Sequence, residues 1–252
     1  MLRRAFTLVE LMVVIAIIAI LMTIAVPVMV KVKGAVYQFA AVQSIRGLML
    51  ATNMYAGDND EVYPPAVYNT PTGMVAWFGG QREDGTFDPR TGLLANYSHG
   101  RPGADRSFKA KDYLGDQSGF GYNWGYVGSD FNVTGDYRGF PNCDNPARMS
   151  EIERPSSVVG FSTSAYYYAS WQKGGDGQIY DFGFIDPPKY WNGKPNVHFR
   201  FGEMPVVDDA AQTVTPRGNA IFLFLDGSVR TLGPSRVTDA MFERAGEDPA
   251  NR

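Results

Sequence analysis

The chain has 252 residues, of which 44% are hydrophobic and 19% are charged, and its formal net charge is −3. This composition is typical of a folded protein and excludes general disorder and collagen-like repeats. The single cysteine, Cys143, excludes a disulfide framework within the chain and a cysteine-rich zinc module. The two histidines, His99 and His198, leave little material for a histidine-ligated metal centre.

Charge, glycine and proline are unevenly distributed along the chain. Residues 1–56 contain five basic side chains and one acidic one, whereas the remaining residues contain 18 basic and 25 acidic ones. Most glycines and every proline except Pro27 also follow residue 56. A helix-compatible first part therefore precedes a loop-rich, weakly acidic body. Because nucleic-acid binding needs a basic surface, this body argues against a nucleic-acid partner.

An uncharged apolar run extends from Leu11 to Val30. As a helix, its 20 residues would span roughly 30 Å, the hydrocarbon thickness of a bilayer. Arg3 and Arg4 precede the run, which predicts a cytoplasmic N terminus and a translocated body. A cleaved secretory signal peptide is one alternative, but the run is long and Thr23-Ile24-Ala25 is a poor cleavage site. A plain membrane anchor is a second alternative.

The segment Ala5-Phe6-Thr7-Leu8-Val9-Glu10 stands between the basic tail and the apolar run. It resembles the class III leader of type IV prepilins and type II secretion pseudopilins. The resemblance implies that a prepilin peptidase cuts between Ala5 and Phe6 and methylates the new amine of Phe6. It also implies insertion in the inner membrane and assembly with other pilin or pseudopilin subunits into a pilus or secretion pseudopilus. Ala5 departs from the glycine that usually precedes the cut.

Glu10 and Pro27 are the candidate functional residues of the apolar helix. An ionisable side chain at the edge of a membrane helix is a functional candidate. The resemblance implies that Glu10 pairs with the amine of Phe6 in a neighbouring subunit and so sets the axial register. The alternative is a Glu10 that reaches the lipid headgroups without a specific role. Pro27 is expected to kink or locally unwind the helix.

Apolar residues continue at helical spacing beyond the uncharged run, at Ala35, Phe39, Val42, Ile45 and Met49. This pattern predicts one helix from Phe6 to Ala56, followed by a stop at Gly57. The expected organisation is a leader at 1–5, a transmembrane assembly helix at 6–30, an amphipathic continuation at 31–56 and a periplasmic or extracellular body at 57–252.

The acidic side chains just after this helix are a candidate calcium site, formed by Asp58, Asp60 and Glu61. Hard cations bind clustered carboxylates, although the spacing lacks the loop pattern of a known calcium motif. The alternative is an ordinary polar turn. No other cofactor is expected.

Short apolar or aromatic runs separated by turn residues fill the body and predict short strands, at 74–78, 121–127, 157–162, 220–225 and 228–232. The last two flank Asp226-Gly227, the expected turn of a tight hairpin. Residues 173–215 are rich in Gly, Asp and Pro and are expected to form long loops. The predicted fold is α+β, with a long N-terminal helix packed on a small antiparallel sheet.

Parts of the body resemble the DUF1559 group of pilin-like proteins. Leu48 to Pro65 resembles its helix end, acidic turn and Pro-Pro pair, and the Asp226-Gly227 turn, with Phe224 before it, resembles its C-terminal motif. Pro216 stands where that motif has a histidine. The group's usual Cys-Pro pair is also absent.

The sequence has no Gly-x-Ser-x-Gly elbow, no His-Glu-x-x-His motif and no phosphate-binding Gly-x-x-x-x-Gly-Lys loop. The resemblance to pilins and pseudopilins implies a structural subunit rather than an enzyme. Two alternatives stay open. One is a membrane-anchored module that binds a glycan or another substrate through the aromatic runs 166–171 and 190–191. The other is an anchored hydrolase that uses paired carboxylates among Asp176, Asp181 and Asp186. His198 near Glu203 and Asp208 could suggest a metal or acid/base pair, but a lone histidine beside loop acids is usually incidental.

Overall fold

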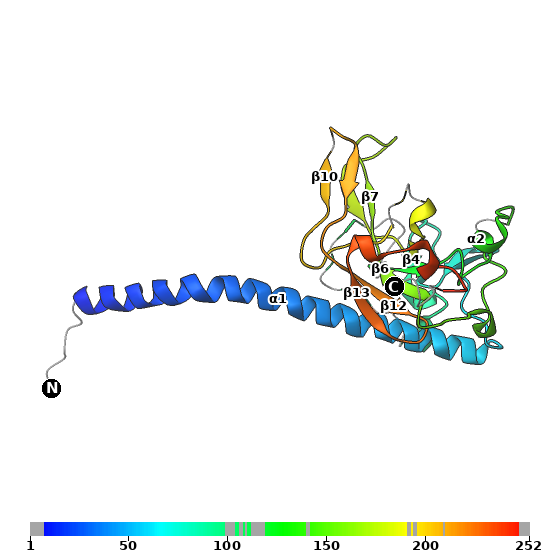
Figure 1. Ribbon diagram of the computed structural model, residues 1–252, viewed down its shortest axis with the longest axis horizontal. Helices are drawn as coiled ribbons and strands as arrows, with labels where there is room; N and C mark the ends of the chain where they lie inside the picture. Colours follow the sequence, from blue (N-terminus) through cyan, green and yellow to red (C-terminus); the bar gives the residue numbers. More distant parts are fainter. Residues whose placement is uncertain are drawn as a thin grey trace. The chain divides into compact units, whose positions relative to one another are not determined.

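The computed structural model describes residues 8–98, 104–105, 108, 110–111, 119–139, 142–190, 193, 196–208 and 210–246. The chain divides into two compact units, Met1–Phe39 and Ala40–Arg252. The long helix α1, Leu8–Asp58, contributes residues to both units (Figure 1).

The long helix is confirmed and ends two residues later than predicted. It continues through Pro27, so the helix does not stop at this proline. Its end is set by Asp60 and Glu61, whose backbones adopt the left-handed conformation with φ of 51° and 59°. The Asn59 side chain donates to the carbonyl of Tyr55 at 2.7 Å and satisfies one of the last carbonyls of the helix.

The second unit is built on a five-stranded sheet with the order β13-β12-β6-β5-β9. Its strands are β13 Val229–Leu232, β12 Ala220–Phe224, β6 Val159–Thr163, β5 Phe120–Asn123 and β9 Phe184–Ile185. β5 and β9 are parallel, and the other neighbours are antiparallel. Together with α1, this sheet confirms the predicted α+β class.

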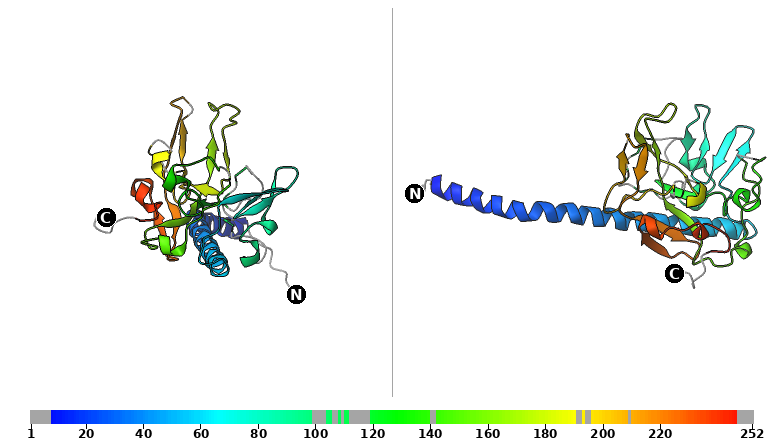
Figure 2. Two further views of the ribbon diagram at one scale, coloured as in Figure 1. Left: turned by 90° about the vertical axis from the view of Figure 1, so that its right-hand side faces the viewer. Right: turned by 45° about the horizontal axis from the view of Figure 1, so that its top comes forward.

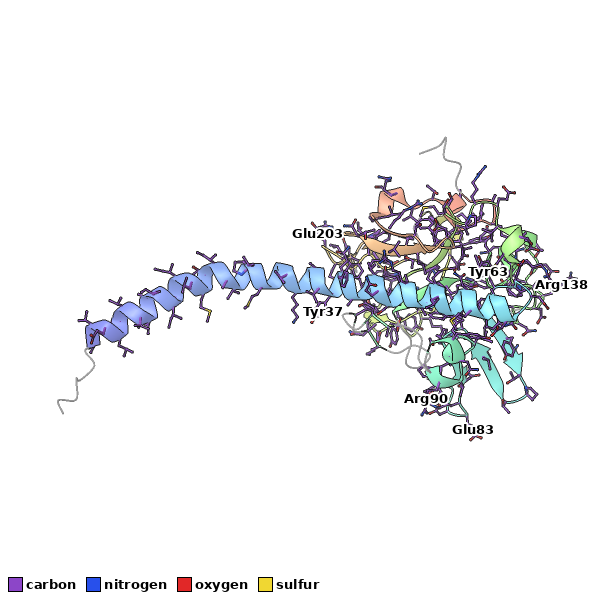
Figure 3. The ribbon with its side chains drawn as sticks, turned by 90° about the horizontal axis from the view of Figure 1, so that it is seen from below. Tyr37, Tyr63, Glu83, Arg90, Arg138 and Glu203 are labelled. Carbon is purple, nitrogen blue, oxygen red and sulfur yellow. The ribbon has the colours of Figure 1, made fainter. Side chains whose placement is uncertain are left out.

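The part of α1 from Ala40 onward supplies one layer of the main core (Figure 3). Ile45 and Leu48 are fully buried and belong to the same cluster as Phe161, Ile221 and Leu223 of the sheet. Ile45 and Met49 of the predicted apolar stripe thus pack as the helical periodicity predicts, and Val42 is partly buried against the same core. Ala35 and Phe39 of that stripe are exposed, so this part of the prediction is wrong for the single chain.

Alternate residues of β12 belong to two different cores. Ile221 and Leu223 join the cluster that contains the helix, whereas Phe222 and Phe224 join a second cluster with Phe242. Because successive side chains of a strand point to opposite faces, the sheet is buried on both sides. This explains why Ala220–Phe224 is an uninterrupted apolar run.

β12 and β13 form a hairpin, and Asp226 and Gly227 lie in its turn. Gly227 has φ of +86°, a conformation that favours glycine. The Asp226 carboxylate accepts a hydrogen bond from the Ser228 backbone N–H at 2.9 Å. Asp226 and Gly227 therefore suit the backbone conformation of this tight turn, as the Asp-Gly signature predicts.

The remaining strands form one small sheet and two hairpins. The small sheet has the order β1-β2-β3-β4, with β1 Val67–Thr70, β2 Gly73–Ala76, β3 Gly79–Gln81 and β4 Phe87–Asp88. The hairpins are β7 Tyr166–Tyr168 with β8 Gln178–Tyr180, and β10 Val206–Asp208 with β11 Thr213–Thr215. The short helices are α2 Phe131–Thr134, η1 Pro89–Thr91, η2 Ala95–Tyr97, η3 Met149–Glu151, η4 Pro188–Tyr190, η5 Pro234–Arg236 and η6 Asp239–Met241.

The prediction of long loops at 173–215 is wrong in part. β8, β9, β10 and β11 all fall within this range. Each of these strands has only two or three residues, which is too short for the alternation that identifies a strand in sequence. These strands are defined by their hydrogen bonds to neighbouring strands and not by a pattern in their own residues.

Candidate functional site

The helical residues from Leu8 to Met29 are all exposed in the first unit. The exposed fraction is 57% for Ile15, 60% for Leu21 and 65% for Ile24. This is the one helix of the described residues that is long and apolar enough to cross a membrane, judged by length and composition. An apolar surface of this extent needs lipid or other apolar helices as its surroundings.

Glu10 lies in the first turn of α1 and is the acidic residue of that turn. It is exposed, as are the apolar residues around it. A carboxylate at this end of a helix also interacts favourably with the helix dipole. Ala5 and Phe6, the predicted cleavage and methylation residues, lie outside the described residues.

Polar groups within the apolar part of the helix are satisfied locally. The Thr23 hydroxyl donates to the carbonyl of Ile20 at 2.6 Å. Such a bond lets a hydroxyl enter an apolar environment without an external partner. The described part of this segment thus suits a membrane or the interior of a helical assembly.

The comparison with known families adds the deciding observation. Residues 1–26 match the model of the prokaryotic N-terminal methylation motif. The chain carries a prepilin-type N terminus. This match supports a type IV pilin-like or pseudopilin subunit, and the apolar helix fits a membrane-anchored protein. No curated protein and no solved structure matches the chain.

The match covers the leader, Glu10 and most of the apolar run, and it ends just before Pro27. It does not reach the body of the chain. The resemblance of the body to the DUF1559 group therefore stays a hypothesis.

The acidic turn after α1 gains no support as a calcium site. Within the described residues, no group of three or more His, Cys, Asp or Glu side chains could hold a metal ion. The carbonyl of Asp60 accepts a hydrogen bond from Arg148 at 3.1 Å, and the carbonyl of Glu61 accepts one from the N–H of Met149 at 2.8 Å. These contacts tie the end of the helix to the body, which is the role of a structural turn.

The three carboxylates of the hydrolase hypothesis have separate hydrogen-bond partners. Asp176 pairs with Lys111 at 2.6 Å, and this contact lowers its pKa, whereas a general acid needs a raised one. Asp181 accepts hydrogen bonds from the N–H of Gly119. Asp186 accepts a hydrogen bond from the indole of Trp124 at 2.6 Å. This arrangement favours structural roles over a shared catalytic centre.

His198 does not pair with the acids that follow it in sequence. It is 7% exposed, and neither ring nitrogen has a hydrogen-bond partner in the part of the chain that the structure describes. Burial, with a smaller contribution from Arg200, lowers its pKa to about 3. Glu203 lies at the surface, 4.0 Å from Arg217 (Figure 3), and Asp208 caps the β10–β11 turn.

Cys143 is buried, and burial raises the pKa of its thiol to about 11. Since the thiolate is the reactive form, this cysteine has a packing role.

Sequence reasoning noticed the aromatic run Tyr166–Trp171 but not its neighbours. The structure brings Tyr167 and Trp171 to one cavity with His198, Val207 and Val214. The aromatic run was the available signal. The hairpin that completes the cavity has no signature of its own, because β10 and β11 are three-residue strands.

Proposed function

We propose that this protein is a structural, non-enzymatic subunit of a filament of the type IV pilus or type II secretion kind. A prepilin peptidase removes residues 1–5 and methylates the amine of Phe6. Before assembly, the mature subunit is inserted in the inner membrane, with its N terminus on the cytoplasmic side and its body on the periplasmic side. It then joins other pilin-type subunits through its apolar helix. The observation that carries this proposal is the methylation-motif match at residues 1–26.

The exposed surface of α1 supports the assembly step. Transfer of the helix from lipid into a bundle of similar helices keeps its apolar residues away from water. Packing between the helices supplies the attraction, since lipid is as apolar as the side chains it covers. The second unit contains both hydrophobic cores, and we expect it to keep its structure in this step.

Glu10 is proposed to give the assembly its register. A carboxylate in apolar surroundings is costly unless a cation is nearby. The amine of Phe6 in an adjacent subunit is such a cation, and it exists only after the leader is cut. Cleavage and assembly are then coupled, because the uncut chain does not present this amine.

The test of this proposal is the intact mass of the protein from cells that co-express a prepilin peptidase. The expected product begins at Phe6 and carries one methyl group on its amine. A catalytically inactive peptidase is the control and leaves residues 1–5 in place. A chain that remains uncut with the active peptidase, or that is cut near Ala25, contradicts the proposal.

A further inference from the structure

The β7–β8 and β10–β11 hairpins stand side by side on the second unit (Figures 1 and 2). Residues from both hairpins line a cavity of about 280 Å³. Its volume is near the lower end of the ~300–1,000 Å³ range of small-molecule sites, which suits a ligand the size of a single ring. The described residues that line it lie between Ala165 and Pro216, within the body.

One wall of the cavity is aromatic. Tyr167 and Trp171 line it with ring centroids 6.1 Å apart and planes inclined by 58°. The opposite hairpin contributes the apolar side chains of Val207 and Val214. An aromatic ring offers a flat face to the C–H groups of a ligand ring.

Next to the aromatic wall lies the imidazole of His198, which also lines the cavity. A neutral imidazole has one N–H donor and one acceptor nitrogen, and a hydroxyl can pair with either. Here both nitrogens lack a partner within the described residues, and leaving buried polar groups unpaired costs stability. The nitrogens are shielded from solvent, so the ligand reaches them through a side-chain rotamer change of the kind common on binding.

The side chains that line the cavity within the described part of the chain carry no formal charge, because the imidazole of His198 is neutral. Among the described residues that line the cavity, none is Lys, Arg, Asp or Glu. A charged ligand would lose its hydration without gaining an ionic partner. The cavity therefore favours a neutral ligand with one apolar face and several hydroxyl groups.

A wider hollow of about 630 Å³ adjoins this cavity and shares Tyr167, Ile179 and Val207 with it. It is lined in addition by Lys111, which is held by Asp176. The shared residues make the two spaces neighbours, so a ligand bound in the cavity can extend into the hollow.

We infer that the cavity between the two hairpins binds a neutral sugar unit of a glycan. The ring stacks on Tyr167 and Trp171, a hydroxyl pairs with His198, and the next sugar unit occupies the wider hollow. This site is independent of the proposed filament function, since none of its residues belongs to α1. It would give the assembled or the membrane-bound protein a means of attachment to a polysaccharide.

The experiment is a titration of the full-length protein with the methyl glycosides of glucose and N-acetylglucosamine. Binding is monitored by saturation-transfer NMR. The detergent must lack a sugar headgroup, because a maltoside would compete for the site. We expect saturation of ring protons and a Kd that rises about tenfold or more in Trp171→Ala and His198→Phe, the equivalent of one lost contact. His198→Phe keeps the ring and removes both nitrogens.

Val207→Lys provides a variant with little effect on folding, because Val207 is 36% exposed. Its long side chain is expected to obstruct the cavity and abolish binding. Val133→Lys is the matched control: Val133 is 51% exposed, does not line the cavity, and the same substitution there should leave the affinity unchanged.

Two results would overturn the inference. The first is that neither glycoside binds, and the second is that binding survives both Trp171→Ala and Val207→Lys. If neither glycoside binds but p-cresol, a mimic of a tyrosine side chain, does, the cavity is assigned to a partner protein instead. The mass of the mature chain does not depend on any of these outcomes, so failure here is distinguishable from failure of the filament proposal.

Discussion

At the scale of single residues, Glu10 has the largest expected effect on function. Glu10→Ala would leave the amine of a neighbouring Phe6 without its anion in an apolar contact. Breaking a buried ion pair costs about 3–5 kcal/mol, which corresponds to a weakening of subunit association by more than about 100-fold. We expect no sedimentable filaments, while the variant is still cut and found in membranes.

Glu83→Ala is the control for this experiment. Glu83 is an exposed residue in the loop between β3 and β4, far along the chain from the apolar helix (Figure 3). Its removal should leave filament yield unchanged. Filaments that form normally from Glu10→Ala protein would show that register is set elsewhere.

His198 links the stability of the body to pH. Its pKa is about 3 in the folded chain and 6.5 without the fold. Well above pH 6.5 the imidazole is neutral in both states. As pH falls from 6.5 toward 3, only the unfolded chain takes up this proton, so the free energy of unfolding decreases by about 1.4 kcal/mol per pH unit.

The measurement is urea unfolding at pH 7, 6 and 5, followed by tryptophan fluorescence. All four tryptophans lie in the second unit, so the signal reports on the body. His198→Phe should lose stability less steeply than the natural chain over this range. Equal slopes would mean that His198 is accessible to protons in the folded protein.

At the scale of elements, Gly→Ala substitutions at two positions should change the free energy of unfolding in opposite directions. Gly47 is an exposed position within α1, and a Cβ added there meets nothing within 4 Å. Gly47→Ala should therefore stabilise the second unit by about 0.5–1 kcal/mol, because glycine is a poor helix former. At Gly128 the same change would place a Cβ 2.7 Å from Ala66 Cβ and Tyr122 Cε1.

Gly128→Ala should destabilise the body by about 1–3 kcal/mol, the usual cost of overpacking a core. Thermal unfolding of the two variants, compared with the natural chain, measures both effects. A fall in the melting temperature of Gly47→Ala would indicate that the exposed face of α1 needs close approach by another helix at this position.

The elements differ in how well they can be predicted. The helix has apolar residues at helical spacing over many turns, and the β12–β13 hairpin has two strong strands around an Asp-Gly turn. Each signal is local and therefore visible in sequence. The β7–β8 and β10–β11 hairpins have three-residue strands, and their position depends on contacts with distant segments.

At the scale of the whole molecule, the second unit needs the end of the helix. Ala41, Ile45, Leu48 and Ala51 are buried in the main core. A fragment that starts at Ala40 keeps these side chains, whereas a fragment that starts at Gly57 exposes the apolar surface they cover. We expect 40–252 to unfold cooperatively and 57–252 to aggregate or lack a sharp transition.

Thermal unfolding followed by near-UV circular dichroism distinguishes the two fragments. Fragment 40–252 should show the aromatic signal of a packed core. Trp77 contributes to this signal, because its indole N–H donates a hydrogen bond to the carbonyl of Gly183 at 2.7 Å and the ring is held in place. If 57–252 melts as sharply and at the same temperature, the helix is not an integral part of the core.

The sequence by itself determined the membrane-compatible helix, the leader motif around Ala5 and Glu10, and the Asp226-Gly227 hairpin. These features depend on hydrophobicity, charge and turn chemistry among near neighbours in the chain. Only the tertiary structure decided which partners the isolated polar residues have and whether they are buried. It gave Asp176, Asp181 and Asp186 separate partners and buried His198 beside Tyr167 and Val207. Such contacts join segments far apart in sequence, and local patterns contain no information about which distant segment will supply the partner.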